Sequence, residues 1–213
     1  VANVFFVLAG ADTLDEIEAV ERDVSPLLAR HNNALYLNRR IYARIADLYT
    51  RRDTLSLDAE QARVLERYHT RFVRSGAAID TPAQDRLAEI NERLASLGTQ
   101  FGQNVLSDEK SFVMVLEESD LAGLPDFAIA AARAAGDERG HPGKYVITLA
   151  RSSVETFLQF SSRRDLREKA FQAWISRGEN GGATDNRALI GEMVVLRAER
   201  AKVMGDTVPA STL

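Results

Sequence analysis

A long run of apolar residues at helical spacing limits the folds that this chain can adopt. The run follows Thr81-Pro82, a capping residue and a proline at the first helical position, and Gln84 is placed to reach back to the cap. Its apolar positions alternate in steps of three and four residues: Leu87, Ile90, Leu94, Leu97, Phe101 and Val105. This spacing is typical of an antiparallel, coiled-coil-like seam. The sequence therefore predicts one long helix that ties two helical layers together.

The residues at the start of the chain also show helical spacing, with several expected interruptions. A short buried helix is predicted over residues 4–11, and Thr13 with Glu16 forms a capping box for the next helix. Ser25-Pro26 is expected to end or kink that helix, because proline lacks a backbone donor and clashes with the preceding turn. Asn32-Asn33 predicts a further break.

Two more helices are predicted between this break and the seam. The first runs from Leu37 to about Arg52. A polar turn follows, and Asp58 with Gln61 three residues later forms a second capping box. Gly76 is expected to close the helix that this box opens.

The hydrophobic period changes after the seam and predicts two short strands. Residues 112–116 and 145–149 alternate in the manner of strands and are separated by an alanine-rich helix that ends near Gly136. The intervening helix leaves parallel pairing open, but antiparallel pairing is expected of two exposed strands. Ser152 or Ser153 is expected to cap a short helix after the second strand. The predicted fold class is mainly α, with one small two-stranded β element.

A helical hairpin is predicted at the end of the chain. Its first helix begins near Ser162 and stops at Gly178, and its second begins after a cap at Asp185 or Asn186. The loop 178–182 is rich in glycine and, with Arg187, could hold an anion at the start of the second helix. It lacks the lysine and serine of a phosphate loop, so a plain turn between helices is the favoured interpretation.

The segment AFQAWISRGENGGATDNRALIGEMVVLRAERAKVMG resembles part of the dipeptidyl carboxypeptidases, which are bacterial zinc peptidases of the thimet-oligopeptidase family. The resemblance rests on Arg177-Gly178, Asp185-Asn186 and the run from Leu196 to Ala201. It extends upstream through LDAEQARVLERYHTRFVRSGA, RLAEINERLASLGTQFGQNVL and DLAGLP, and so covers the chain from Val4 to Gly205.

The resemblance implies an N-terminal, non-catalytic portion of a zinc-dependent peptidyl-dipeptidase. Residues 1–205 would form a helical wall of a channel that admits short peptides, and 206–213 would be a polar tail or a cut end. The implied parent is a metallopeptidase whose C-terminal domain holds the zinc. The implied partners are short peptides and that C-terminal catalytic domain. The start at Val1 rather than at a methionine agrees with a piece of a longer chain.

The catalytic motif of such a peptidase is HExxH, in which two histidines one helical turn apart bind zinc. The chain has three histidines, His31, His69 and His141, and no two of them are four residues apart. We therefore expect no catalytic, cofactor-binding or metal-binding residue in this chain, and the sequence assigns no channel-lining residue. His31 is expected at a helix end and His141 in a turn. Glu66 and His69 match half of a di-iron motif, but no second half occurs.

Composition excludes some partners and leaves one alternative function. The net charge of −4 argues against nucleic acid, and no apolar run is long enough to cross a membrane. The absence of cysteine agrees with a reducing compartment, so a cytoplasmic location is expected. The alternative is a stand-alone helical interaction module that shares ancestry with the peptidases and has lost catalysis.

Overall fold

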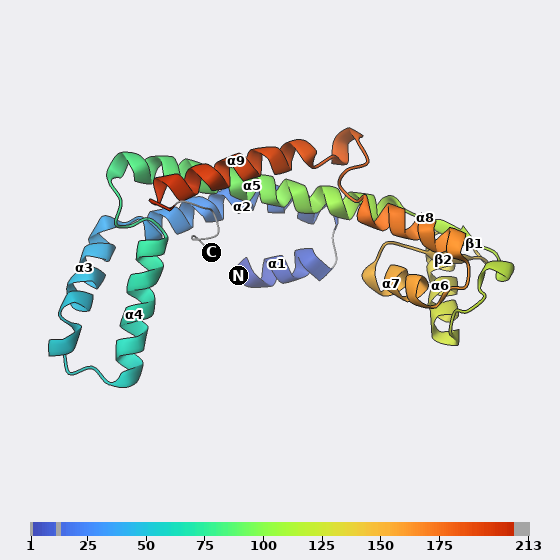
Figure 1. Ribbon diagram of the computed structural model, residues 1–213, viewed down its shortest axis with the longest axis horizontal. Helices are drawn as coiled ribbons and strands as arrows, with labels where there is room; N and C mark the ends of the chain where they lie inside the picture. The colour runs from blue at the N-terminus through green and yellow to red at the C-terminus, as the bar shows by residue number, and fades with distance from the viewer. Residues whose placement is uncertain (1, 12–13, 207–213) are drawn as a thin grey trace. The chain divides into compact units, whose positions relative to one another are not determined.

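The computed structural model describes residues 2–11 and 14–206. Their fold is mainly helical with one small antiparallel sheet, as the sequence predicts (Figure 1). The chain divides into two compact units, one with residues up to 100 and from 189 onward, the other with residues 101–188. Two long helices, α5 (Thr81–Ser111) and α9 (Arg187–Val203), contribute residues to both units. No helix in the described ranges has the length and apolar character needed to span a membrane.

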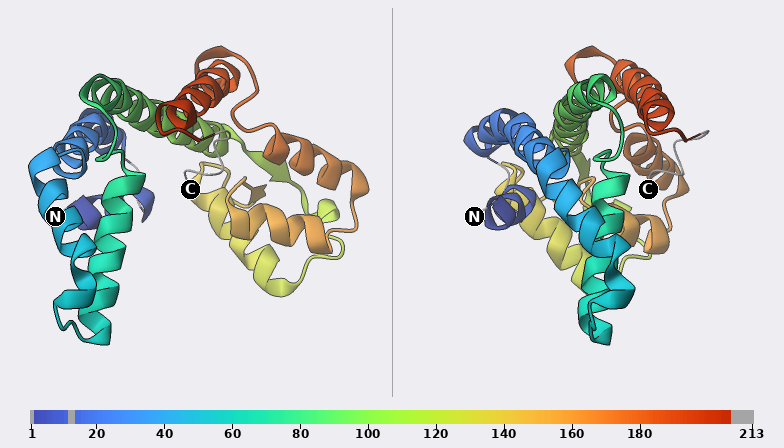
Figure 2. Two further views of the ribbon diagram at one scale, coloured as in Figure 1. Left: turned by 60° about the vertical axis from the view of Figure 1, so that its left-hand side comes forward. Right: turned by 90° about the vertical axis from the view of Figure 1, so that its left-hand side faces the viewer.

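In the first unit, α5 lies beside α2 (Asp15–Tyr36), as Figures 1 and 2 both show. The Thr99 hydroxyl donates to the Ser25 hydroxyl at 2.9 Å, and the Asn33 amide donates to the Ala88 carbonyl at 3.2 Å. Residue numbers therefore rise along α2 while they fall along α5, so the two helices are antiparallel. Polar side chains set the register of this contact.

The other side of α5 packs against α9 through apolar side chains. Ile90, Leu97 and Leu196 are buried at the centre of this contact. Partly buried side chains surround them: Leu94, Leu189 and Met193. Two ion pairs of exposed side chains flank the contact: Arg86–Glu199 and Arg93–Glu192. Exposed pairs contribute about 0–1 kcal/mol each, so burial of the apolar seam dominates the stability of this contact.

A helical hairpin extends the first unit (Figure 2). Its elements are α3 (Arg39–Thr50), the 3-10 turn η1 (Arg52–Thr54) and α4 (Ala59–Arg74). The capping box is confirmed: the Gln61 N–H donates to the Asp58 carboxylate at 2.8 Å, and the Asp58 N–H donates to the Gln61 side chain at 3.2 Å. The imidazole of His69 on α4 stacks on the ring of Tyr49 on α3, with centroids 4.0 Å apart. Aromatic contacts therefore join the two helices.

The second unit is built around the small sheet. Its elements are β1 (Met114–Leu116), η2 (Glu118–Asp120), α6 (Asp126–Glu138), β2 (Tyr145–Ile147), α7 (Arg151–Phe160), α8 (Arg164–Ile175) and η3 (Gly182–Thr184). The strands are antiparallel, with Met114 opposite Ile147 and Leu116 opposite Tyr145. The buried core includes Leu116, Ile147, Leu149, Val154, Phe157 and Ala170.

Helix α6 approaches β2 so closely that only glycine fits at position 136. A Cβ atom there would lie 2.4 Å from the carbonyl oxygen of Lys144. The Gly136 carbonyl accepts a hydrogen bond of 2.8 Å from the N–H of His141, which closes the turn before the strand. Backbone groups therefore set the spacing of helix and strand.

The predicted ends of α2 at Pro26 and at Asn32-Asn33 are wrong. The helix runs without a break through Pro26 and through Asn32-Asn33. Asn33 donates to Ala88 and accepts from the amide of Asn91 at 3.0 Å, so its polar side chain serves the contact with α5 instead of ending the helix. Tertiary contacts override the local preference of asparagine for turns.

The first helix is present but is not buried as predicted. In α1 (Ala2–Ala11), Val4, Val7 and Leu8 are exposed, and Ala9 is buried. The described part of the chain places too little apolar surface over α1 to cover these side chains. Thr13 of the predicted capping box lies outside the described residues.

Two predicted helix caps differ from those in the structure. At the start of α5, the Asp80 carboxylate accepts from the Ala83 N–H at 2.9 Å, so Asp80 takes the role expected of Thr81. Gln84 does not reach back to the cap but donates to the carbonyls of Gly76 and Ala77. At α7, neither Ser152 nor Ser153 occupies the cap position, which belongs to Ala150.

The buried seam predicts a clear contrast between two truncations. Leu97→Ala removes a side chain that is 1% exposed and should lower the free energy of unfolding by about 2–5 kcal/mol, because it leaves a cavity. Val195→Ala on α9, where the side chain is 65% exposed, should change it by less than about 0.5 kcal/mol. Urea unfolding followed by circular dichroism measures both, and equal losses would contradict the described packing.

Candidate functional site

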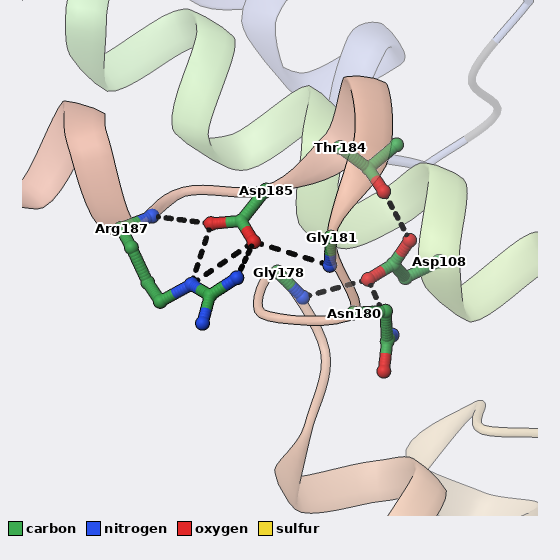
Figure 3. A network of polar contacts seen from close by, with 7 residues as sticks. All are labelled: Asp108, Gly178, Asn180, Gly181, Thr184, Asp185 and Arg187. Atoms are coloured by element: carbon green, nitrogen blue, oxygen red, sulfur yellow. Dashed lines mark hydrogen bonds and ion pairs between the residues drawn. The ribbon is translucent and has the colours of Figure 1, made fainter.

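A buried carboxylate organises the loop between α8 and α9 (Figure 3). Asp108, near the end of α5, is 9% exposed. It accepts hydrogen bonds from the Gly178 N–H at 2.7 Å, the Asn180 amide at 2.8 Å and the Thr184 hydroxyl at 2.6 Å. The three donors belong to one loop, so a single carboxylate holds that loop against α5.

Asn186 fixes the far end of the same loop. Its side chain is 1% exposed, accepts from the Asn104 amide at 2.9 Å and donates to the Phe101 carbonyl at 3.1 Å. Its backbone N–H donates to the Gly178 carbonyl at 2.6 Å. Both the oxygen and the nitrogen of the buried side-chain amide therefore have hydrogen-bond partners, as burial of a polar group requires.

Of the two candidates for the cap of the helix that follows, Asp185 supplies the side-chain oxygen, although Asn186 is the residue directly before the helix. Its carboxylate accepts from the Arg187 N–H at 2.9 Å and from the Gly181 N–H at 3.1 Å, and it pairs with the Arg187 guanidinium. Asn186 makes its side-chain contacts to α5 instead.

A second link ties the same loop to α5. The Arg177 guanidinium pairs with Glu109 at 2.7 Å, and both side chains are about a quarter exposed. The Nε atom of Arg177 donates to the Trp174 carbonyl at 2.9 Å, and its guanidinium lies 5.6 Å from the centroid of the Trp174 ring. Asp108 and Glu109 therefore both hold the residues that follow α8.

Two carboxylates of this network have lowered pKa values. Burial of Asp108 raises its pKa, but hydrogen bonds from Thr184, Gly178 and Asn180 outweigh burial, so the pKa lies below the ordinary 3.8. The Arg187 side chain and backbone lower the pKa of Asp185 to about 2. Both groups are therefore charged at neutral pH, and the donors around them stabilise the charged form.

These contacts favour a structural turn over an anion-binding loop. The N–H groups of Gly178 and Gly181 donate to the chain's own carboxylates, and Arg187 is paired with Asp185. An external anion would have to displace those carboxylates to reach these donors. The loop has the donor arrangement of an anion cradle, but side chains of the same chain fill it.

Sequence reasoning missed Asp108, although the sequence carries a signal for it. The residue lies three positions after Val105 and so continues the apolar seam of α5. A charged residue at a seam position is buried only when it has partners. The partners lie about seventy residues away in the sequence, where no local pattern points to them.

The three histidines belong to different elements and have different environments. His31 lies inside α2 and not at a helix end as predicted, because α2 is longer than expected. His69 stacks on Tyr49, and Glu66 of the half di-iron motif pairs with Arg63 at 2.6 Å. His141 lies in the turn before β2, as predicted.

Comparison with known proteins gives matches along almost the whole chain. Dipeptidyl carboxypeptidase of Escherichia coli is 35% identical over 206 residues, which cover 96% of this chain and 30% of the relative. Dipeptidyl carboxypeptidase of Salmonella typhimurium is 32% identical over the same shares. Oligopeptidase A of Escherichia coli is 30% identical over 88% of this chain and 28% of the relative.

This chain is a homologue of the thimet-oligopeptidase family peptidases. It spans less than a third of the length of the relatives named above. No protein-family model matches the sequence.

The described residues do not fit the zinc that the family resemblance implies. Within residues 2–11 and 14–206, no three side chains of His, Asp or Glu come close enough to hold a metal ion. His69 instead stacks on the ring of Tyr49, and the ring of Tyr42 lies 6.0 Å away at a tilt. The expectation that no residue of this chain is catalytic stays a prediction.

The turn at Gly178 predicts a difference between two glycines with the same backbone conformation. Gly178 and Gly181 have φ of 77° and 78°, but a Cβ atom at Gly178 would lie 2.7 Å from the Asn186 amide, whereas the space at Gly181 is open. Gly181→Ala should lower the free energy of unfolding by about 1 kcal/mol through backbone strain. Gly178→Ala should lower it by about 1–3 kcal/mol more, because it also displaces Asn186. Urea unfolding measures both, and equal losses would contradict the close approach.

The lowered pKa of Asp108 predicts a loss of stability in acid. Because the unfolded chain takes up the proton first, the stabilisation is complete above pH 3.8 and is lost as pH falls through the folded-state pKa below that value. Asp108→Asn removes a charged acceptor, so it should be clearly less stable than the wild type at pH 6. That difference should shrink below pH 3.8. Urea unfolding at pH 6, 4 and 2.5 measures it, and a constant difference would exclude a charged Asp108 as the cause.

Proposed function

We propose that this chain is the N-terminal, non-catalytic part of a zinc-dependent peptidyl-dipeptidase or oligopeptidase. The observation that carries the proposal is the 35% identity over 96% of the chain to a dipeptidyl carboxypeptidase of which it spans 30%. The zinc and the groups that cleave the peptide bond would belong to the remaining part of such an enzyme, its C-terminal catalytic domain.

The role proposed for this part is that of a wall of the substrate channel. A wall must hold its shape when an unstructured peptide passes, and the antiparallel contacts of α5 with α2 and α9 give the first unit a rigid frame. The wall would exclude folded proteins and orient short peptides, which lowers the entropic part of the barrier without any bond-breaking group. The extent of this wall, residues 1–205, and the tail 206–213 stay predictions.

The proposed setting is the cytoplasm, with short peptides as partners and without nucleic acid or membrane. The absence of cysteine and the net charge of −4 support it. The relatives that match 88% of this chain include proteins named oligopeptidase A. Their name supports short peptides as the substrate class.

The first test uses the 213-residue chain alone. We expect no stoichiometric zinc by mass spectrometry of the purified, tag-free protein and no cleavage of a fluorogenic short peptide. The intact dipeptidyl carboxypeptidase of Escherichia coli is the positive control. One zinc per chain together with cleavage that a chelator abolishes would refute the non-catalytic assignment.

The second test restores the missing part. This chain replaces the matching 206 residues of the Escherichia coli relative, and a form from which those residues are deleted is the control. The replacement should cleave short peptides about a hundredfold faster than the deletion, because positioning losses have this size. A replacement that is folded and binds zinc, yet cleaves no faster than the deletion, would favour the interaction module without catalysis.

A further inference from the structure

The first unit carries a hollow of about 830 Å³ that is lined mainly by arginines. It lies along α4 and beside the C-terminal part of α9, both labelled in Figure 1. Five arginines line it against one acidic residue, Glu66, although the chain as a whole has a net charge of −4. The arginines are Arg63, Arg67, Arg71, Arg74 and Arg200. Positive charge is therefore concentrated at one place in an acidic protein.

Most of this charge is not neutralised by the described residues. Arg63 pairs with Glu66 at 2.6 Å. The Arg71 guanidinium lies 4.4 Å from the centroid of the Tyr36 ring, a contact that holds the cation and leaves its charge uncancelled. Arg67 and Arg74 form no ion pair within the part of the chain that the structure describes.

Arg200 adds an independent observation. Its Nε atom is buried and has no hydrogen-bond partner in the described ranges. A buried donor without a partner is costly, and each such group in a folded protein calls for an explanation. Arg200 is one of the residues that line the hollow, so the hollow includes a guanidinium whose hydrogen bonding is incomplete.

The spacing of the arginines determines the shape of a matching ligand. The four arginines of α4 recur at steps of three and four residues and so share one face of the helix. They span about 16 Å, at 1.5 Å per residue. Their mutual repulsion disfavours the helix unless an anion is present. A compact anion would reach only part of this row, whereas about five residues of an extended peptide match its length.

We propose that this hollow binds an extended peptide segment with several acidic side chains. Guanidinium groups match carboxylates in shape and charge and form paired hydrogen bonds with them. Val64 and Tyr68, which are 48% and 54% exposed, border the row and offer apolar surface to the rest of the peptide. The proposal concerns binding by this chain alone and is independent of its role in a peptidase.

The test measures binding to the 213-residue chain by fluorescence anisotropy. The probe is fluorescein-labelled hexaglutamate, and labelled hexaglutamine is the neutral control. Arg67→Gln with Arg74→Gln removes two charges of the hollow. Arg44→Gln with Arg133→Gln removes two exposed charges on α3 and α6 and is the matched control. Circular dichroism confirms that both variants keep their helical content.

We expect hexaglutamate to bind, hexaglutamine not to bind, and the affinity to fall as salt rises from 50 to 200 mM. The hollow variant should bind about tenfold more weakly, and the control variant should bind as the wild type does. Equal losses in both variants would mean a non-specific charge effect and would overturn the site. Unlabelled hexaglutamate should displace the probe at a lower concentration than tripolyphosphate or an oligothymidylate. The reverse order would refute the proposal that the ligand is an acidic peptide.

Discussion

The carboxylate of Asp108 is the contact on which the connection between α8 and α9 depends. It is buried on α5 and receives three hydrogen bonds from a loop that has almost no apolar side chains of its own. Such a loop cannot be held by hydrophobic burial. A charge-assisted network takes its place, because hydrogen bonds to a carboxylate are stronger than those between neutral groups and fix directions as well as distances. Asp108 holds the middle of the loop, and Asn186 and Asp185 hold its end, from which α9 begins.

The chain thus combines two kinds of stabilisation along one helix. The earlier part of α5 contributes apolar side chains, which gain free energy in proportion to the area they bury and tolerate small shifts. Its last turns contribute Asn104, Asp108 and Glu109, whose partners must lie within hydrogen-bonding distance. The first kind supplies most of the free energy of the helix contacts. The hydrogen bonds to these polar side chains determine the conformation of the loop, which could adopt many conformations without them.

Much of the fold could be predicted from the sequence, because apolar period and capping chemistry are local signals. The capping box at Asp58, the strand pair and the two helices on either side of the loop at 178–186 were all predictable on that basis. The predicted hairpin of these two helices is not observed among the described residues, because α8 packs against α7. The failures at Asn33 and Ser153 have a common cause. Each side chain makes a contact outside its own helix, Asn33 with Ala88 and Ser153 with the N–H of Thr148, and neither the apolar period nor the capping pattern points to these partners. The glycines of the sequence indicated the loop of the candidate site, but the sequence did not indicate Asp108, the carboxylate at its centre.

The contact between Gly136 and Lys144 has a consequence for motion within the second unit. Because a backbone carbonyl fills the space where a side chain would stand, no rotamer change can loosen the contact of α6 with β2. Separation of the two elements breaks the hydrogen bond from His141 to Gly136, in the turn that leads into the strand pair. Amide protons of the strand and of the end of the helix should therefore exchange with solvent in a single cooperative event. Helix, turn and strand then behave as one unit on the timescale of hydrogen exchange.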